Sequence, residues 1–270
     1  MSQITIVGAQ GLIGSRIAKA LGEVARLAPR NLSSFEPSSV LIWAAGTSKS
    51  RISNLESGNA FREMLRTLED LDFTQLNRFI LLSSAGAVYG SNRGIHVTEH
   101  STLQPETPYA KLKVDIENEI RVRCQKYGIG LDILRLANVY TNAGFGLIAK
   151  LINGPERVQK ISLYASLDST KQYGHVDDYA FCISQFAQKT LHVSQTRTVN
   201  VFAPHSYSIQ RILELFSNYK EIEIENEEQL SDMPTETVIL DTIHTELNLK
   251  PESWSTLEQY LNEYFEESNQ

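Results

Sequence analysis

The sequence predicts an α/β protein with a Rossmann-type doubly wound parallel sheet and a small C-terminal substrate lobe. Over the first two-thirds of the 270 residues, short apolar segments alternate with amphipathic ones. The first apolar segment leads directly into a glycine-rich turn. Because the short segments are apolar on both sides, they fit a parallel sheet that helices cover on both faces.

The elements are expected in the following order. The strands of the sheet are Ile4–Val7, Val24–Leu27, Val40–Ala45, Phe79–Ser83, Leu131–Leu136 and Val199–Phe202. The helices cover about 11–21, 59–71 and 108–127, with a C-terminal helix over Leu257–Phe265. The acidic segment 221–228 is expected to be solvated surface.

Composition excludes several classes of partner. The formal net charge is -7, so no basic surface supports nucleic-acid binding. Cys124 and Cys182 are the only cysteines, too few for a disulfide framework, which favours a reducing compartment. The N-terminus does not resemble a signal peptide, and no apolar run would span a bilayer. We expect a cytoplasmic protein without a membrane or nucleic-acid partner.

A glycine motif joins the first strand to the first helix. It reads Gly8-Ala9-Gln10-Gly11-Leu12-Ile13-Gly14. Glycines here permit a tight turn and a close approach of the backbone to a pyrophosphate, and the third permits close helix–strand packing. The helix N-terminus then presents free N–H groups to the phosphates. An ordinary turn is the alternative, but the position favours a dinucleotide site made by Gly8, Gln10, Gly11, Leu12, Ile13 and Gly14.

The end of the second strand bears on the choice of cofactor. An acid there would bind a ribose 2′-OH, whereas an arginine would accommodate a 2′-phosphate. The segment 24–30 ends in Arg30 and contains no acid. Arg30, with Arg26 in reserve, therefore favours NADP over NAD, although both could be solvated surface residues.

Tyr109 and Lys113 lie four residues apart on an expected helix, so they share one face. A neighbouring ammonium favours the phenolate form of a tyrosine. Such a tyrosine can exchange a proton with an alcohol or sugar oxygen while a hydride moves to or from nicotinamide. The pair alone is common, but downstream of a dinucleotide motif it indicates redox chemistry.

The division into domains follows from the loss of the alternating pattern after about Thr141. Residues 1–140 with about 174–202 are expected to form the dinucleotide-binding Rossmann domain. Residues of about 141–173 and 203–270 are expected to form the small substrate-binding lobe.

Several motifs in order resemble the extended short-chain dehydrogenase/reductase superfamily, the NAD-dependent epimerase/dehydratase family. Besides the glycine motif, they are Trp43-Ala44-Ala45-Gly46, Leu82-Ser83-Ser84-Ala85-Gly86-Ala87-Val88-Tyr89-Gly90, Thr98-Glu99, Pro108-Tyr109-Ala110-Lys111-Leu112-Lys113, Leu134-Arg135-Leu136-Ala137-Asn138-Val139-Tyr140 and Tyr173-Gly174-His175-Val176-Asp177-Asp178. The resemblance covers nearly the whole chain. It is specific for the superfamily and says little about the substrate.

The resemblance implies roles for particular residues. Tyr109 would be the catalytic acid/base, and Lys113 its partner and a ligand of the nicotinamide ribose. Ser84, with Ser83 in reserve, would hold the reacting oxygen. The implied substrate contacts are Ser84, Asn138 and, against a diphosphate, Lys171. The further cofactor contacts it implies are Ala44, Ala45, Gly46, Ser83 and Val139.

Four departures from the family pattern bear on the chemistry. The usual hydroxyl position is Ala85, so Ser84 must serve from one residue earlier. Gly86 and Ala87 replace the acids of nucleotide-sugar dehydratases, which disfavours elimination. Segment 31–39 is too short for the usual helix and strand, so the adenine end of the site is more open. Gln229-Leu230 stands where a second diphosphate-binding arginine is expected.

Three functions are consistent with these observations. The first, and the one we expect, is a reductase of a nucleotide-linked keto-sugar. The preference for NADP and the open adenine side favour it, because both suit a cofactor that exchanges. The second is a nucleotide-sugar epimerase that keeps its NAD. The third is a non-catalytic NAD(P)-binding regulatory protein, which the tyrosine–lysine pair disfavours. The family resemblance also suggests a homodimer through helices within 59–71 and 114–127.

Overall fold

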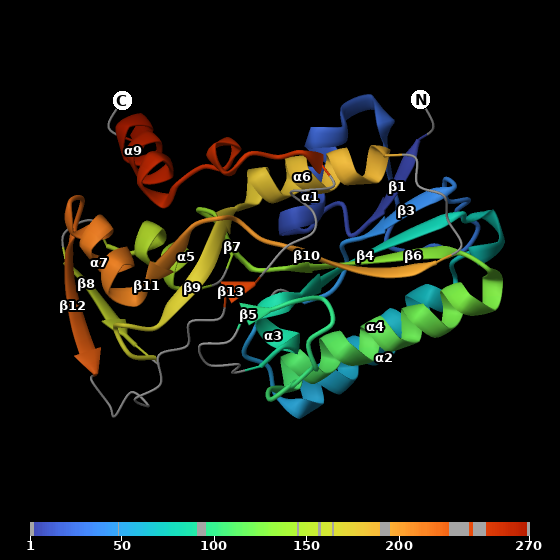
Figure 1. The fold of residues 1–270 in the computed structure, drawn as a ribbon, viewed down its shortest axis with the longest axis horizontal. Helices are drawn as coiled ribbons and strands as arrows, with labels where there is room; N and C mark the ends of the chain where they lie inside the picture. Colours follow the sequence, from blue (N-terminus) through green and yellow to red (C-terminus); the bar gives the residue numbers. More distant parts are fainter. Residues whose placement is uncertain are drawn as a thin grey trace.

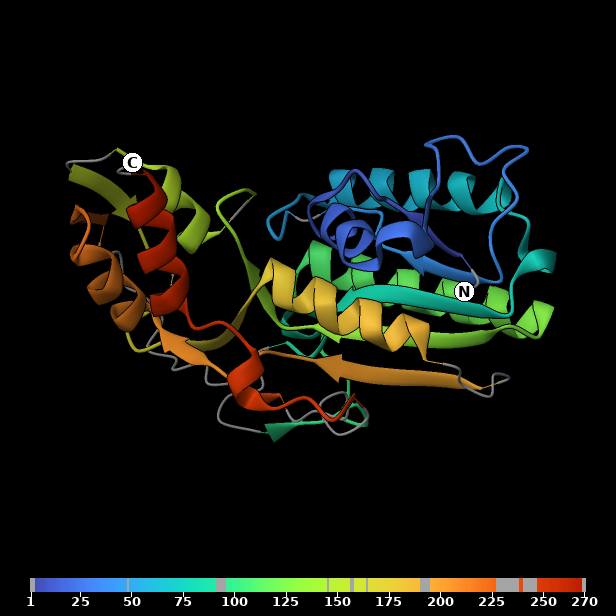
Figure 2. The same cartoon turned by 90° about the horizontal axis from the view of Figure 1, so that it is seen from above.

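The computed structural model describes residues 3–47, 49–90, 96–144, 146–155, 158–163, 165–189, 195–226, 238–239 and 247–268. The chain forms two parts that lie side by side along the long axis of the molecule (Figures 1 and 2). One part is a sheet with helices on both faces. The other is a smaller lobe that contains the C-terminal helix.

The larger part is built on a six-stranded sheet. From one edge to the other its strands are β10 (Thr196–Val201), β6 (Gly130–Leu136), β4 (Arg78–Ser84), β3 (Val40–Trp43), β1 (Ile4–Val7) and β2 (Ala25–Leu27). All neighbouring strands pair in parallel. The predicted Rossmann-type fold class is therefore confirmed.

Helices cover both faces of this sheet (Figure 2). The helices are α1 (Leu12–Leu21) and α6 (Val176–Gln188) on one face, and α2 (Asn54–Glu69) and α4 (Pro108–Tyr127) on the other, with the short α3 (Ala85–Val88) after β4. Along β4, Ile80 and Leu82 pack toward one helix layer, whereas Phe79 and Leu81 pack toward the other. This alternation with period two explains why the strand is apolar throughout.

In the residues that the structure describes, the smaller lobe contains short sheets and the helices α5 (Leu147–Asn153), α7 (Ile209–Ser217) and α9 (Leu257–Ser268) around a separate apolar core. Its strands form the sheet of β11 (Ser206–Ser208), β9 (Thr170–His175) and β7 (Asn138–Tyr140) and the parallel pair β12 (Glu221–Asn226) and β8 (Val158–Ser162). A two-stranded pair, β13 (Val238–Ile239) and β5 (His96–Val97), completes the described strands. The division into two domains at the boundaries given above stays a prediction.

Two predicted elements need correction. Helix α2 begins at Asn54 rather than near residue 59, because Ser53 and Glu56 form a capping box at its start. Segment 221–226 is a strand rather than plain solvated surface. Its isoleucines, Ile222 and Ile224, pack against the lobe core, while the glutamates between them face solvent.

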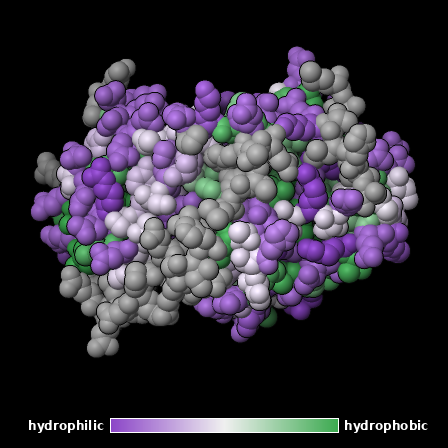
Figure 3. Space-filling view, viewed as in Figure 1, coloured by the Kyte–Doolittle hydropathy of each residue, from purple (hydrophilic) through white to green (hydrophobic). Residues whose placement is uncertain are grey.

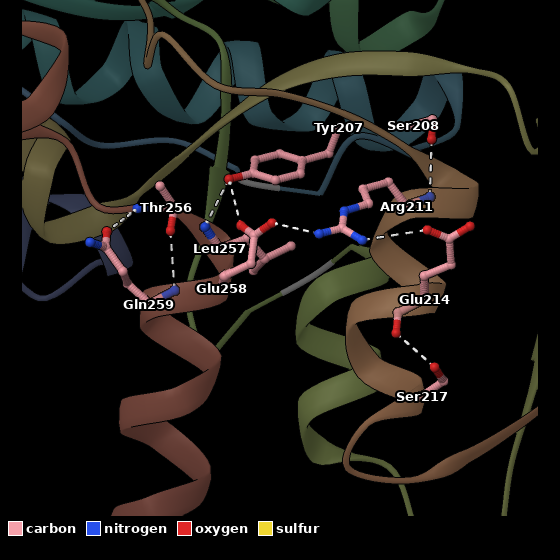
Figure 4. A network of polar contacts seen from close by, with 9 residues as sticks. All are labelled: Tyr207, Ser208, Arg211, Glu214, Ser217, Thr256, Leu257, Glu258 and Gln259. Atoms are coloured by element: carbon pink, nitrogen blue, oxygen red, sulfur yellow. Dashed lines mark hydrogen bonds and ion pairs between the residues drawn. The ribbon is translucent and has the colours of Figure 1, made fainter.

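A polar network fixes α9 to α7 and β11 (Figure 4). The Tyr207 hydroxyl accepts a hydrogen bond from the Leu257 N–H at 2.9 Å and donates to Glu258 at 3.3 Å. Arg211 donates to the other Glu258 oxygen at 3.1 Å. Burial raises the pKa of Tyr207 to about 12, so its hydroxyl stays protonated at neutral pH. These contacts indicate that the polar residues of the network have a structural role, which is to connect α9 with α7 and β11.

The molecular surface is mostly polar on the face shown in Figure 3, where hydrophobic residues occupy small separate areas among the coloured residues. Within the described residues, no helix combines the length and the apolarity required to span a bilayer.

Candidate functional site

The glycine turn lies where β1 ends and α1 begins, beside the end of β3. Gly8 has a φ of +86°, and the Gly11 N–H donates to the Gly8 carbonyl at 2.9 Å. A Cβ atom on Gly8 would lie 2.5 Å from the Ala45 nitrogen, and one on Gly14 would lie 2.2 Å from the Gly8 oxygen. The turn can therefore form only with glycine at positions 8 and 14.

The first turn of α1 is open to a ligand. Gly11 is the N-cap residue, and no side-chain cap to the first N–H groups is present among the residues that the structure describes. Gln10 and Gly11 are exposed, whereas Leu12 and Ile13 are half-buried. The half-buried Ala44 and Ala45 and the exposed Gly46 end the neighbouring strand β3. A helix N-terminus at this strand end suits a pyrophosphate.

The adenine end of this region is trimmed as predicted. Strand β2 is the edge of the sheet, and residues 28–39 form neither helix nor strand. The Arg26 guanidinium lies 4.9 Å from the centroid of the Phe35 ring, so Arg26 packs against this loop. Arg30 is exposed.

Tyr109 and Lys113 occupy the first turns of α4. Thr107 caps this helix by accepting from the Ala110 N–H at 3.1 Å, and Pro108 fills its first position. The Lys113 ammonium lies 5.6 Å from the centroid of the Tyr109 ring, and both side chains are half-buried. The predicted sharing of one helix face by the two residues is thus present in the structure.

The direction of α4 places this pair beyond the end of β4. Tyr127, near the end of α4, stacks on Phe73, which precedes β4. Glu117, in the middle of α4, accepts a hydrogen bond from Ser83 near the end of β4. Helix α4 therefore runs back along β4, and Lys113 and Tyr109 lie one and two turns beyond Glu117, at the carboxyl edge of the sheet.

The two serines at the end of β4 differ in burial and in hydrogen bonding. Ser83 is buried, and its hydroxyl donates to the Glu117 carboxylate at 2.6 Å. Ser84 is half-buried, and within the described part of the chain its hydroxyl makes no hydrogen bond. The Ser83 side chain is thus engaged inside the protein, so a contact of Ser83 with a cofactor would have to come from its backbone.

Asn138 lies beside the residues that follow Ser84. A Cβ atom on Gly86 would lie 3.9 Å from the Asn138 side-chain oxygen, and the Asn138 amide nitrogen donates to the Gln172 carbonyl at 3.0 Å. Ala85 is fully buried and offers no hydroxyl. The structure therefore brings Asn138 of β7 next to the end of β4, and the half-buried Val139 packs against the sheet core beside it.

Lys171 lies on β9, two residues before the partner of Asn138 in the β7–β9 ladder. Its side chain is exposed to solvent. Desolvation lowers the pKa of Lys171, and the positive charge of Arg51 lowers it further. Arg51, which sequence reasoning did not single out, therefore adds a second positive charge near Lys171. Gln229 and Leu230 lie outside the described residues.

Sequence reasoning also missed a buried ion pair beneath the site. Arg135 of β6 donates two hydrogen bonds to Glu117, one of them at 2.7 Å. A charged residue inside the apolar strand Leu134-Arg135-Leu136 is the signal that could have indicated a buried partner. Within the described ranges, acids, histidines and cysteines nowhere gather in threes as a metal site would require.

A doubly wound sheet with a glycine turn at the end of its first strand defines a Rossmann-type dinucleotide-binding protein. Over residues 25–201 the chain matches the NAD dependent epimerase/dehydratase family, which is more than half of its length. The chain belongs to this family, and the resemblance to the extended short-chain dehydrogenase/reductase superfamily is confirmed.

Individual relatives agree with this assignment. A protein of Methanocaldococcus jannaschii named "Putative UDP-glucose 4-epimerase" is 28% identical over 121 residues, or 43% of this chain. The matched region spans only 40% of that relative's length.

Two solved structures share the fold over almost their whole length. UDP-glucose 4-epimerase of Thermotoga maritima with UDP-glucose has a TM-score of 0.75 and 18% identity, covering 99% of this chain and 100% of that one. UDP-glucuronic acid 4-epimerase of Bacillus cereus in complex with NAD has a TM-score of 0.76 and 18% identity, with the same coverage. At this level of identity, the likeness concerns the fold.

Proposed function

We propose that the protein is a nucleotide-sugar epimerase of the NAD-dependent type, in which Tyr109 is the acid/base. Family membership and the relatives named above support epimerisation better than the keto-sugar reduction first expected from the sequence. The observation that carries the proposal concerns the hydrogen bonding of three polar groups. Within the described chain, the Tyr109 hydroxyl, the Lys113 ammonium and the Ser84 hydroxyl are half-buried and make no hydrogen bond.

The neighbours of these three groups make the contrast clear. Ser83, Glu117 and Asn138 all have hydrogen-bond partners within the protein. Half-buried polar side chains that make no hydrogen bond within the described chain can bind a ligand. We therefore assign Tyr109, Lys113 and Ser84 to substrate and cofactor, with Ser84 rather than Ser83 supplying the hydroxyl.

The dinucleotide would lie over the glycine turn. Gly8 and Gly14 leave a cradle that a Cβ atom would fill, and the open N-terminus of α1 suits the pyrophosphate. The other residues that we expect around the cofactor are Gln10, Gly11, Leu12, Ile13, Ala44, Ala45, Gly46, Ser83, Tyr109, Lys113 and Val139.

The choice between NAD and NADP depends on the end of β2. The family description and the NAD complex of the Bacillus cereus relative support NAD. The exposed Arg30 supports NADP. We take NAD as the first cofactor to test, and the ratio of the dissociation constants for NADH and NADPH measures the preference.

The sugar nucleotide would extend from Ser84 past Asn138 to Lys171. Asn138 is held beside Gly86 and Gln172, which fixes it at the end of β4. Lys171 and the nearby positive charge of Arg51 suit a diphosphate. This arrangement compensates for the absence of an arginine at 229–230.

In the proposed reaction, each of these residues has a separate role. Tyr109 takes the proton of a sugar hydroxyl and later returns a proton to the same oxygen, which leaves the residue unchanged. Ser84 donates a hydrogen bond to that oxygen. Lys113 keeps a positive charge beside the Tyr109 ring, where it stabilises negative charge that develops on the phenolic oxygen. A bound nicotinamide supplies the hydride exchange with the sugar carbon.

Replacement of Tyr109 by phenylalanine tests the assignment. Tyr109→Phe should lower kcat for UDP-sugar epimerisation by roughly 10²–10⁴-fold, because the acid/base is lost, while cofactor binding persists. Interconversion of UDP-sugars followed by NMR measures the first effect, and fluorescence titration with NADH the second. Unchanged turnover in Tyr109→Phe would refute the catalytic role. A wild-type protein that binds NADH but converts no sugar would favour the regulatory alternative.

A keto-sugar reductase is the second candidate, and the trimmed adenine end supports it. With β2 at the sheet edge and no helix over 28–39, a cofactor could exchange readily. The cofactor state after purification separates the two functions. Tightly bound NAD that survives gel filtration is expected for the epimerase, whereas an empty site with stoichiometric NADPH consumption would establish the reductase.

A further inference from the structure

A buried carboxylate beneath the site is held by three hydrogen bonds. Glu117 is 1% exposed. It accepts from the Ser83 hydroxyl at 2.6 Å and from Arg135 at 3.0 and 2.7 Å. Both Arg135 bonds come from one edge of the planar guanidinium, which gives a bidentate ion pair of defined orientation.

The ion pair continues into a longer buried network. Arg135 also donates to the Tyr89 hydroxyl at 2.9 Å, and Tyr89 donates to the Asn200 side chain at 2.8 Å. The Asn200 N–H in turn donates to Glu99 at 2.9 Å. Burial raises the pKa of Tyr89, so it remains a neutral phenol that can both accept and donate.

Strand β4 and helix α4, which carry proposed site residues, and strand β6, which leads to Asn138, each contribute one member to this network. Ser83 precedes Ser84 at the end of β4. Glu117 lies one helical turn after Lys113 on α4. Arg135 lies three residues before Asn138, at the end of β6. The network therefore joins the three elements whose relative placement determines the geometry of the site.

We propose that Glu117 and Arg135 are positioning residues, which set the Tyr109–Lys113 pair against the Ser84 hydroxyl. This inference rests on the proposed function. Because Tyr109, Lys113 and Glu117 follow one another at four-residue intervals on α4, any shift of Glu117 along β4 moves the other two with it. A misplacement of about 1 Å at a reacting group can lower the rate by about a hundredfold.

The chain offers a matched control at the opposite ends of the same two strands, β4 and β6. Arg78 of β4 pairs with Asp132 of β6 at 2.7 Å, and both side chains are buried. This pair also makes a charge-assisted hydrogen bond inside the sheet domain, but it lies at the amino ends of the strands, away from Ser84. It should stabilise the fold without positioning the site.

The experiment compares the isosteric variants Glu117→Gln and Asp132→Asn. Both should lower the melting temperature. Glu117→Gln should lower kcat about tenfold or more with a KM change of less than about threefold, whereas Asp132→Asn should keep kcat within about twofold. Ser83→Ala removes one hydrogen bond and keeps the ion pair, so it provides a milder variant if Glu117→Gln does not fold. It should lower kcat by about threefold or more.

A second readout needs no turnover. Fluorescence titration with NADH reports on the position of Lys113, because Lys113 is expected to bind the nicotinamide ribose. The dissociation constant for NADH should rise about threefold or more in Glu117→Gln or Ser83→Ala and stay unchanged in Asp132→Asn. Equal losses of kcat in both charge variants, or an unchanged dissociation constant for NADH in Glu117→Gln, would overturn the inference. If the wild type converts no sugar, the proposed function fails, while the NADH titration still decides the positioning role.

Discussion

Gly14 occupies the tightest position of the glycine turn. A Cβ atom there would lie 2.2 Å from the Gly8 carbonyl oxygen, which is backbone and cannot swing aside. We predict that Gly14→Ala moves α1 away from β1, lowers NADH affinity more than about tenfold and lowers the melting temperature. Fluorescence titration and thermal unfolding measure the two effects.

Gly58 provides the control for that prediction, because it lies inside α2 and its nearest neighbour would be 4.0 Å from the added atom. Gly58→Ala should leave NADH binding unchanged and stabilise the fold by about 0.5–1 kcal/mol. Normal NADH affinity in Gly14→Ala would contradict the role given to the turn.

At the scale of residues, the sequence predicted those candidate site residues whose arrangement depends only on local geometry. The glycines and the Tyr109–Lys113 pair depend on spacing within one turn or one helix, which is readable from the chain. The choice between Ser83 and Ser84 was not readable, because it depends on Glu117, which is 34 residues away. The contacts of Glu117 arise only from the packing of α4 on β4 and β6.

At the scale of elements, helix α4 was predicted with its observed limits because both ends carry strong signals. Thr107 and Pro108 begin it, and Gly128 ends it with a φ of +68°. The beginning of α2 was missed because the only apolar residue of its first turn, Leu55, is exposed, and the capping box there is the signal to use. Strand β12 was missed because its glutamates conceal an alternation of isoleucines.

His175 joins β9 to α6 and contacts the C-terminal helix. Its ring lies 4.6 Å from that of Tyr260 on α9 and 5.4 Å from that of Tyr140 on β7. Burial lowers the pKa of His175, although the carboxylates Asp177 and Asp178 act in the opposite direction. The neutral imidazole therefore stabilises the contact of α9 with β7 and β9.

The pH dependence follows from this shift. The folded pKa lies below the unfolded value of about 6.5, so the unfolded chain binds more protons between the two values. Stability should fall as the pH drops through about 6.5 toward the folded pKa. We predict a smaller loss of melting temperature between about pH 7.5 and 5.5 in His175→Gln than in the wild type. Equal losses would show that His175 does not contribute.

At the scale of the whole molecule, the expected homodimer would use the outer faces of α2 and α4. Leu55 and Val122 are exposed on these helices, at 71% and 63%. We predict a dimer in sedimentation velocity that Val122→Asp dissociates, because burying an unpaired carboxylate is costly. Phe181→Asp on α6, across the sheet, is the control and should leave the dimer intact. A monomeric wild type would contradict the expectation.

The order of the strands in the sheet has a consequence for synthesis. β10 pairs with β6, and Arg197 of β10 binds Asp132 of β6 at 2.7 Å. Between these two strands the chain forms much of the smaller lobe and all of α6. During translation, β6 is thus an open sheet edge until residue 201 has left the ribosome. That interval exposes an apolar parallel strand to other nascent chains, so a chaperone that shields β6 would protect an open sheet edge during synthesis.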